Sequence, residues 1–188
     1  MGDDTTGEGA VGSTAPVGAL AEHATPLGTT EPSGPFPDTD GLDALLGGAQ
    51  VVGLGEATHG TREFFRLKHR LIRYLVLEHD LRVVAIEANV PETLAIDEYV
   101  VHGRGDPSAA LDGIYFWTWN VAAVLDLIEW LRGFNEGRPV EDRVRFYGLD
   151  VQYTTGAVEH LRGYFETVGE AVPEEIAAGL ETVDDSGR

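Results

Sequence analysis

The sequence has 188 residues, 43% of them hydrophobic, and no cysteine, which is typical of one globular domain without disulfides or a thiolate metal site. Thirty-two acidic residues against thirteen Lys and Arg give a net charge of −19, which disfavours nucleic acids and anionic membranes as partners. No apolar run is long enough to span a membrane and no secretory signal opens the chain, so we expect a cytoplasmic protein.

The acidic composition has two interpretations. An excess of Asp and Glu, with Lys68 as the only lysine, is typical of adaptation to high salt, where screening weakens the repulsion between like charges. An acidic protein from a GC-rich genome would show the same composition, but we favour adaptation to high salt, as in a halophile. Neither interpretation identifies a ligand.

We expect residues 1–40 to form a mostly disordered or loop-rich segment. Residues 1–14 are rich in Gly, Thr and acids and offer little to bury. A proline at position 16 favours a short helix at 16–24, and a loop punctuated by prolines follows it. Regular patterns begin near residue 41, so we expect one domain at 41–188.

Three short apolar runs predict parallel strands, covered on both faces, at 49–55, 82–88 and 144–150. The helical patterns lie at 61–78, 91–101, 121–136 (with Asn120 as its cap), 155–167 and 173–182. Strands that alternate with helices predict an α/β domain with a mainly parallel sheet and flanking helices. Because three strands are few for such a sheet, we expect an incomplete domain whose exposed sheet favours association with other protein surface.

Side chains that can do chemistry follow each predicted strand. Glu56 and His59 follow the first strand, Glu87 ends the second and Asp150 ends the third. Ligands of open α/β sheets bind beyond the carboxyl ends of the strands, so we expect a site at that edge. The first turn, GLGEATHG, is not a phosphate loop, because no Gly-Lys-Ser/Thr follows it and the Glu56 carboxylate would repel phosphate.

Lys68 lies in the middle of the apolar face of the helix predicted at 61–78. A lysine in this position either extends past its apolar neighbours to solvent or pairs with a buried acid. We expect it to approach Glu87 or Glu56, and Glu87 in particular. Further along, Trp117 and Trp119 in YFWTWN either wall a pocket for a bulky apolar substrate or pack in the core.

The motifs GLGEATHGTREFFRLKHRLIRYLV, VVAIEAN, FWTWN and RFYGLDVQ occur in this order within residues 42–168 and resemble the erythromycin esterase family. The family includes proteins of succinoglycan biosynthesis. The resemblance implies an α/β enzyme that hydrolyses the lactone ester of macrolide antibiotics, an activity linked to antibiotic resistance. It implies site roles for Glu56, His59 and Glu87, and for Lys68 where some members carry arginine. It also implies further site residues in a C-terminal half that this sequence does not include.

The chemistry of these residue types fits ester hydrolysis, independently of the family resemblance. A neutral imidazole, here His59, can take a proton from water, and a carboxylate such as Glu56 or Glu87 can orient it. A cation such as Lys68 can keep a carboxylate ionised or stabilise an oxyanion. The chain has no cysteine and no G-x-S-x-G motif, so we expect direct attack by water on a small-molecule ester or lactone. Asp150 and Trp119 complete the predicted site, without a metal ion or a cofactor.

Two alternatives stay open. A metal-dependent hydrolase would use Glu56, His59, Glu87 and Asp150 as ligands, although no H-x-x-x-H pair supports it. A non-catalytic remnant would bind its ligand without turnover.

Overall fold

The computed structural model describes residues 18–19, 21–22, 24, 27–36, 40–46 and 48–186. These residues fall into two compact units, which divide the chain into residues 1–29 with 35–52 and residues 30–34 with 53–188. The disorder predicted for residues 1–14 lies outside the described residues. Within the helix predicted at 16–24, positions 18–19 and 21–22 are helical. The first unit also contains helix α2 (Asp40–Leu46).

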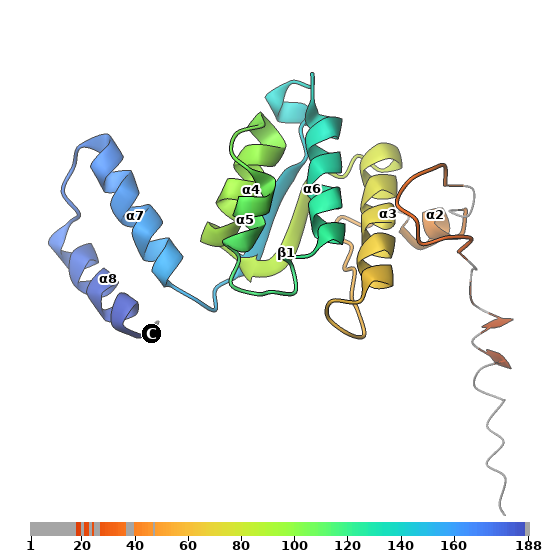
Figure 1. The fold of residues 1–188 in the computed structure, drawn as a ribbon, viewed down its shortest axis with the longest axis horizontal. Coiled ribbons are helices and arrows are strands. Elements are labelled where there is room, and N and C mark those ends of the chain that lie inside the picture. Colours follow the sequence, from red (N-terminus) through yellow and green to blue (C-terminus); the bar gives the residue numbers. More distant parts are fainter. Residues whose placement is uncertain are drawn as a thin grey trace, which may run out of the picture. The chain divides into compact units, whose positions relative to one another are not determined.

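The second unit is an α/β arrangement of a parallel sheet with flanking helices, as predicted, and the described sheet has two strands and not the three expected (Figure 1). Its elements in chain order are α3 (Arg62–Glu78), β1 (Val83–Asn89), α4 (Val90–His102), α5 (Pro107–Asp112), α6 (Ala122–Asn135), the short 3-10 helix η1 (Val140–Asp142), β2 (Arg145–Asp150), α7 (Thr155–Val168) and α8 (Glu174–Ser186). Helices α4 to α6 form the long crossover that two parallel strands require. The helices predicted at 61–78, 91–101, 121–136, 155–167 and 173–182 are confirmed as α3, α4, α6, α7 and α8.

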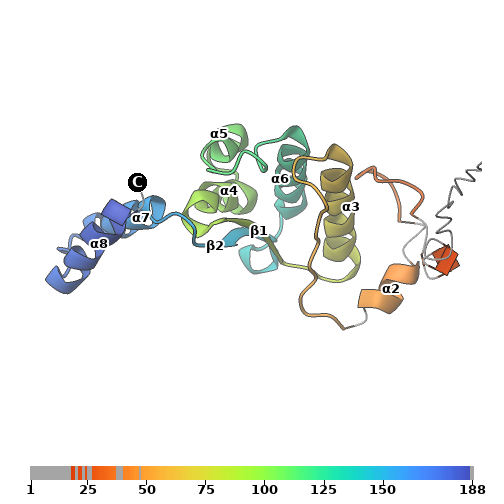
Figure 2. The same cartoon turned by 90° about the horizontal axis from the view of Figure 1, so that it is seen from below.

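The hydrophobic core is formed by one face of the sheet together with residues of helices α3 to α6 (Figure 2). Along β1 burial alternates, so that Val84, Ile86 and Ala88 are buried while Val83 is 51% exposed. On β2, Leu149 is 65% exposed. Alternation with a period of two results when only one face of a strand is packed. The prediction that both faces would be covered is therefore wrong for the described residues.

The segment at 49–55 was predicted as a first strand, and this prediction is wrong. Residues 51–55 form no strand, and no backbone hydrogen bond joins them to β1 in the described part of the chain. A strand forms only where a neighbouring strand satisfies its backbone donors and acceptors. Here β1 pairs with β2, and the described sheet has two strands. Val51 is 88% exposed, and Leu54 packs against the core without joining the sheet.

Two close contacts hold β2 in place. Gly148 lies opposite Ile86, where an added Cβ would stand 2.3 Å from the carbonyl oxygen of Ala88, so only glycine allows this approach. The carboxylate of Asp97 on α4 accepts hydrogen bonds from the Arg145 guanidinium at 2.5 to 3.1 Å. It also accepts one from the Phe146 N–H at 2.9 Å. These contacts fix β2, and hence the end of the sheet, against α4.

The start of α6 differs from the prediction. Asn120, expected as the helix cap, donates its side-chain N–H to Oδ1 of Asp112 at 2.7 Å. Val121 takes the capping position with an extended backbone and no side-chain hydrogen bond. Among the helices that the structure describes, none combines the length and the apolar composition needed to cross a lipid bilayer.

Candidate active site

The loop before α3 forms a cluster of three charged or ionisable side chains. Nδ1 of His59 lies 2.6 Å from Oε1 of Glu56, and Nζ of Lys68 donates a hydrogen bond of 2.6 Å to Oε2 of the same carboxylate. The loop reaches this position because Gly60 adopts φ +73 and turns the chain into α3 at Thr61. Each oxygen of Glu56 therefore has its own partner, one from the loop and one from the helix.

Burial and charge act in opposite directions on Glu56. Its side chain is 9% exposed, and this burial by itself would raise the pKa of the carboxyl. The hydrogen bonds and positive charges of Lys68 and His59 outweigh burial and lower the pKa below its ordinary value. Glu56 is thus an ionised carboxylate at neutral pH. The His59 side chain is 64% exposed, so its ring can be reached by a ligand.

Lys68 approaches a carboxylate, as expected, but its partner is Glu56 and the expectation of Glu87 in particular is wrong. Glu87 lies on the exposed side of β1, opposite the positions that pack on α4 and α6. The loop at Glu56 instead folds back over α3. Nζ of Lys68 also lies 5.5 Å from the ring centre of Phe65 and 5.9 Å from that of Trp119, so the ammonium has two aromatic rings as neighbours.

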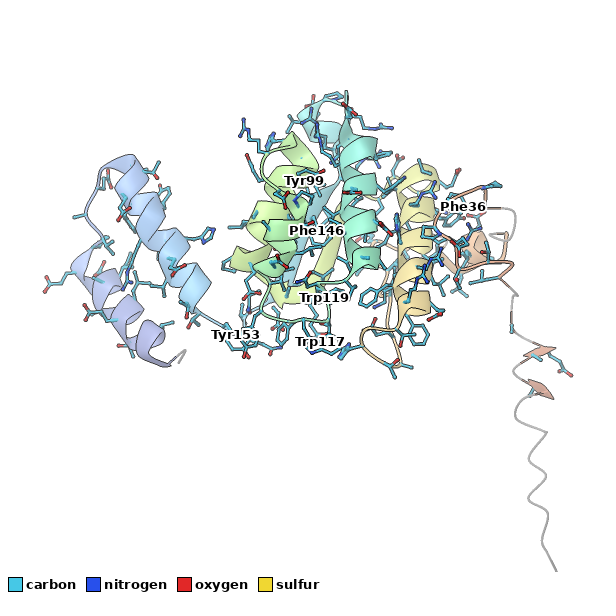
Figure 3. The ribbon with its side chains drawn as sticks, in the orientation of Figure 1. Phe36, Tyr99, Trp117, Trp119, Phe146 and Tyr153 are labelled. Atoms are coloured by element: carbon cyan, nitrogen blue, oxygen red, sulfur yellow. The ribbon has the colours of Figure 1, made fainter. Side chains whose placement is uncertain are left out.

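The turn before α6 joins the loop, α3 and β1. Nε1 of Trp119 donates a hydrogen bond of 2.9 Å to the backbone carbonyl of Glu87, and its ring packs edge-on against Phe65 at 5.7 Å. Trp117 packs on Gly60, where an added Cβ would stand 3.1 Å from the ring. Figure 3 shows both tryptophans at the edge where β1 ends. Trp119 therefore contacts the cluster through the Lys68 ammonium.

The other two predicted acids do not join Glu56 and His59. The side chain of Glu87 is exposed. Asp150 is used within its own turn, where one oxygen accepts the Val151 N–H at 2.7 Å and the other accepts the side-chain amide of Gln152. Within the described ranges, no three His, Asp or Glu side chains gather closely enough to hold a metal ion. The ligand set of the metal-dependent alternative is therefore not assembled there.

Sequence reasoning missed the contacts around Asn89 at the end of β1. Its side-chain N–H donates to Glu92 at 2.9 Å, and its oxygen accepts the Tyr153 N–H at 3.1 Å. The Tyr153 ring lies 3.9 Å from that of Tyr115, so two aromatic rings cover this end of the sheet. An asparagine that ends a buried strand is a signal for such a network, because its buried amide needs partners.

The fold and this cluster define an α/β domain with an acid–histidine–lysine arrangement at the loop before α3. Residues 76–186, more than half of the chain, match the family described as Erythromycin esterase, and the chain belongs to this family. It is 26% identical over 149 residues to the erythromycin esterase type II of Escherichia coli, covering 76% of this chain and 34% of that protein.

Two solved structures are also similar. A succinoglycan biosynthesis protein matches 80% of this chain with a TM-score of 0.71 and 33% identity. A protein from Bacillus cereus matches 80% with a TM-score of 0.69 and 35% identity. The chain spans 36% to 38% of these two proteins and 28% to 34% of the first two curated relatives, about a third of their length.

Proposed function

We propose that this chain carries the water-activating part of a hydrolase that cleaves carboxylic esters, with His59 as the general base. The observation that carries the proposal is the 2.6 Å contact between Nδ1 of His59 and the carboxylate of Glu56. An ionised carboxylate can only accept a hydrogen bond. Nδ1 of His59 therefore carries the hydrogen and donates it to Glu56, and Nε2 of the neutral ring keeps its lone pair. An acid–histidine pair orients a base in the same way in serine hydrolases.

The reaction that follows balances without a covalent intermediate. Nε2 takes a proton from water as the water oxygen bonds to the ester carbonyl carbon. The tetrahedral intermediate then collapses, the bond between the carbonyl carbon and the alkoxy oxygen breaks, and the alcohol leaves with the proton from Nε2. Glu56 stabilises the imidazolium between these steps, and Lys68 keeps Glu56 ionised.

The other predicted residues have supporting roles in this proposal. Trp119 holds the end of β1 and one side of Lys68 in place, as its contacts with the Glu87 carbonyl and the Lys68 ammonium support. Glu87 is a second acid at the end of β1. Asp150 shapes the turn after β2. The name of the Escherichia coli relative suggests erythromycin as the substrate of that protein, and the macrolide lactones that the sequence resemblance implies are the substrate class proposed for this chain.

The test is hydrolysis of p-nitrophenyl acetate by the 188-residue chain. This ester has a leaving group that needs no acid, so the rate reports on water activation alone. His59→Gln should lower kcat by about a hundredfold, which is the usual contribution of a general base. The matched control is His160→Gln, because His160 is exposed and its Nδ1 hydrogen-bonds with the Gly156 carbonyl, away from Glu56 and His59 in the sequence. Equal rates for the wild type and His59→Gln would contradict the proposal.

A chelator separates this proposal from the metal-dependent alternative. Treatment with EDTA should leave the p-nitrophenyl acetate rate unchanged, because none of the proposed steps involves a metal ion. A rate that EDTA abolishes and a divalent cation restores would favour the alternative.

A further inference from the structure

We propose that the cavity between the first turns of α3 and α6 binds an uncharged apolar group of the ester substrate. The cavity has a volume of about 380 Å³, and its lining comes from residue 32, from Gly60 and the start of α3, and from residues 121–126 at the start of α6. This inference rests on the proposed function, because it assigns part of the substrate to a site beside His59.

The cavity adjoins the Glu56–His59–Lys68 cluster in two places. Gly60, which lines the cavity, directly follows His59 in the loop. The Phe65 ring also lines the cavity, and the Lys68 ammonium lies 5.5 Å from the centre of the same ring. Phe65 is therefore shared between the cavity lining and the surroundings of the ion pair. A substrate whose carbonyl group lies at His59 can extend past Gly60 into the cavity.

Much of the lining of the cavity is apolar. It includes the buried Phe65, which is 4% exposed, the small side chains of Ala122 and Ala123, and Pro32. Small side chains at the start of α6 leave the space open, since a larger residue at either alanine would fill it. Burying apolar ligand surface here would contribute binding free energy in proportion to the area removed from water.

The charges at the cavity favour a neutral ligand. Arg62 and Asp126 have opposite charges, and neither forms an ion pair among the residues that the structure describes. Arg66 is already paired with Glu31. With one cation balanced by one anion, and a net charge of −19 for the whole chain, the cavity offers no excess positive charge to an anion.

The volume sets the size of the group. Ligand sites range from about 300 to 1,000 Å³, and this cavity lies near the lower end. It therefore suits a short acyl chain or a single ring, which is a part of a large lactone and not the whole molecule. This limits the class of group to a small aliphatic or cyclic substituent on the ester.

The first experiment compares two esters and two variants. We expect the wild type to have a kcat/KM for p-nitrophenyl hexanoate about tenfold above that for p-nitrophenyl acetate, because the longer acyl chain enters the cavity. Ala122→Phe should remove this preference, because the larger side chain fills the space that the acyl chain would occupy. The matched control is Ala95→Phe. This alanine is also exposed on a helix and lines a cavity of about 370 Å³ to which no residue of the 56–60 loop contributes.

The second experiment needs no turnover. Titration with hexan-1-ol, followed by amide NMR, should shift the resonances of Gly60, Ala122 and Ala123 with saturation in the wild type and in Ala95→Phe. The shifts should be lost in Ala122→Phe, whose circular dichroism spectrum shows whether it is folded. If Ala122→Phe does not fold, the wild-type shifts alone show whether the cavity binds hexan-1-ol, because their measurement requires no variant.

The outcomes separate the two proposals. Saturable hexan-1-ol shifts at the cavity without any ester hydrolysis would contradict the proposed function and support the cavity as a binding site. Hydrolysis that depends on His59 but shows the same preference in Ala122→Phe would overturn the cavity as a substrate site. Hexan-1-ol shifts that are absent, or that lie elsewhere, would overturn it as a binding site.

Discussion

The ammonium of Lys68 lies 2.6 Å from Oε2 of Glu56 and neutralises a carboxylate that is 9% exposed. This pair explains why the only lysine of the chain occupies the apolar face of α3. A buried charge is tolerated when a partner and hydrogen bonds compensate its lost hydration. The same pair holds the loop against α3, so that this contact supports both the structure of the loop and the ionisation of Glu56.

Replacing Lys68 should destabilise the fold. Lys68→Met leaves the Glu56 carboxylate without its main cation, and we expect the free energy of unfolding at about pH 7 to fall by about 2 kcal/mol. Urea denaturation measures this change. The matched control is Arg104→Met, which breaks a pair with Glu98 in which Arg104 is 73% exposed and should cost less than about 1 kcal/mol. Equal losses in the two variants would show that the Lys68 pair has no special role.

The same variant changes the pH dependence of stability. The folded-state pKa of Glu56 lies below its ordinary value of 4.5, so its contribution is present above that value and is lost as pH falls through the folded-state pKa. Without Lys68, burial is less well compensated and the pKa of Glu56 should rise. The acid-induced loss of stability should therefore begin at a higher pH in Lys68→Met than in the wild type.

Gly60 should be sensitive to any added side chain. Gly60→Ala places an alanine at φ +73 and sets its Cβ 3.1 Å from the Trp117 ring. We expect a loss of more than about 2 kcal/mol in the free energy of unfolding and at least about a tenfold lower p-nitrophenyl acetate rate. Gly105→Ala is the matched control, since Gly105 has φ +86 with nothing within 4 Å of an added Cβ.

The comparison isolates the contact with Trp117. Gly105→Ala should cost only the left-handed backbone strain, about 1–2 kcal/mol, and should leave the rate unchanged. Adding Trp117→Ala to Gly60→Ala should recover the part of the loss that comes from the clash. A loss in Gly60→Ala no larger than that in Gly105→Ala would mean that Trp117 does not restrain the loop.

His69 should make the protein less stable in acid. Its side chain is 5% exposed, and within the described residues neither ring nitrogen has a hydrogen-bond partner. Burial, and then the charge of Arg73, lower its pKa from 6.5 to about 4. The unfolded chain therefore takes up a proton below about pH 6.5 that the folded chain takes up only near pH 4. Stability is lost across this window, by up to about 3 kcal/mol.

His69→Leu removes this titration. The variant should gain stability relative to the wild type as the pH falls from about 7.5 to 4.5, as measured by urea midpoints at each pH. The difference in stability between the two proteins at each pH does not contain the contribution of the many carboxylates, because these titrate in both. A difference that stays constant over this range would show that His69 is not buried in its neutral form.

The helices and the parallel pairing could be predicted because both depend on local patterns. The apolar face of α3 and the run from 82 to 88 are visible in the sequence itself. The segment at 49–55 has an equally apolar run, but whether it becomes a strand depends on a neighbour to pair with, which no local pattern shows. Helix α5 has six residues, which are too few to show a helical period of apolar residues. Asp106 followed by Pro107 is nevertheless typical of the start of a helix. The Asp106 carboxylate caps this helix at the Ala109 N–H.

Within the site, the sequence predicted that Lys68 would pair with an acidic residue. It favoured Glu87, whereas the partner is Glu56. Both Glu56 and Glu87 follow apolar runs, and the choice between them depends on how the loop folds back over α3. The hydrogen bond from Trp119 to the Glu87 carbonyl joins residues 32 positions apart and involves a backbone atom that every residue has. A contact of this kind cannot be inferred from the types of the two residues, so only the folded structure shows it.

The most direct test of the central claim is the tautomer of His59, measured by ¹⁵N NMR of histidine-labelled protein at about pH 8, where an ordinary imidazole is neutral. His59→Gln assigns the signal. We predict a hydrogen on Nδ1 and a bare Nε2 in the wild type, with a change toward the Nε2–H form in Glu56→Leu, which removes the acceptor. A wild-type His59 that carries its hydrogen on Nε2, or that does not respond to Glu56→Leu, would contradict the claim that Glu56 orients His59 as a base.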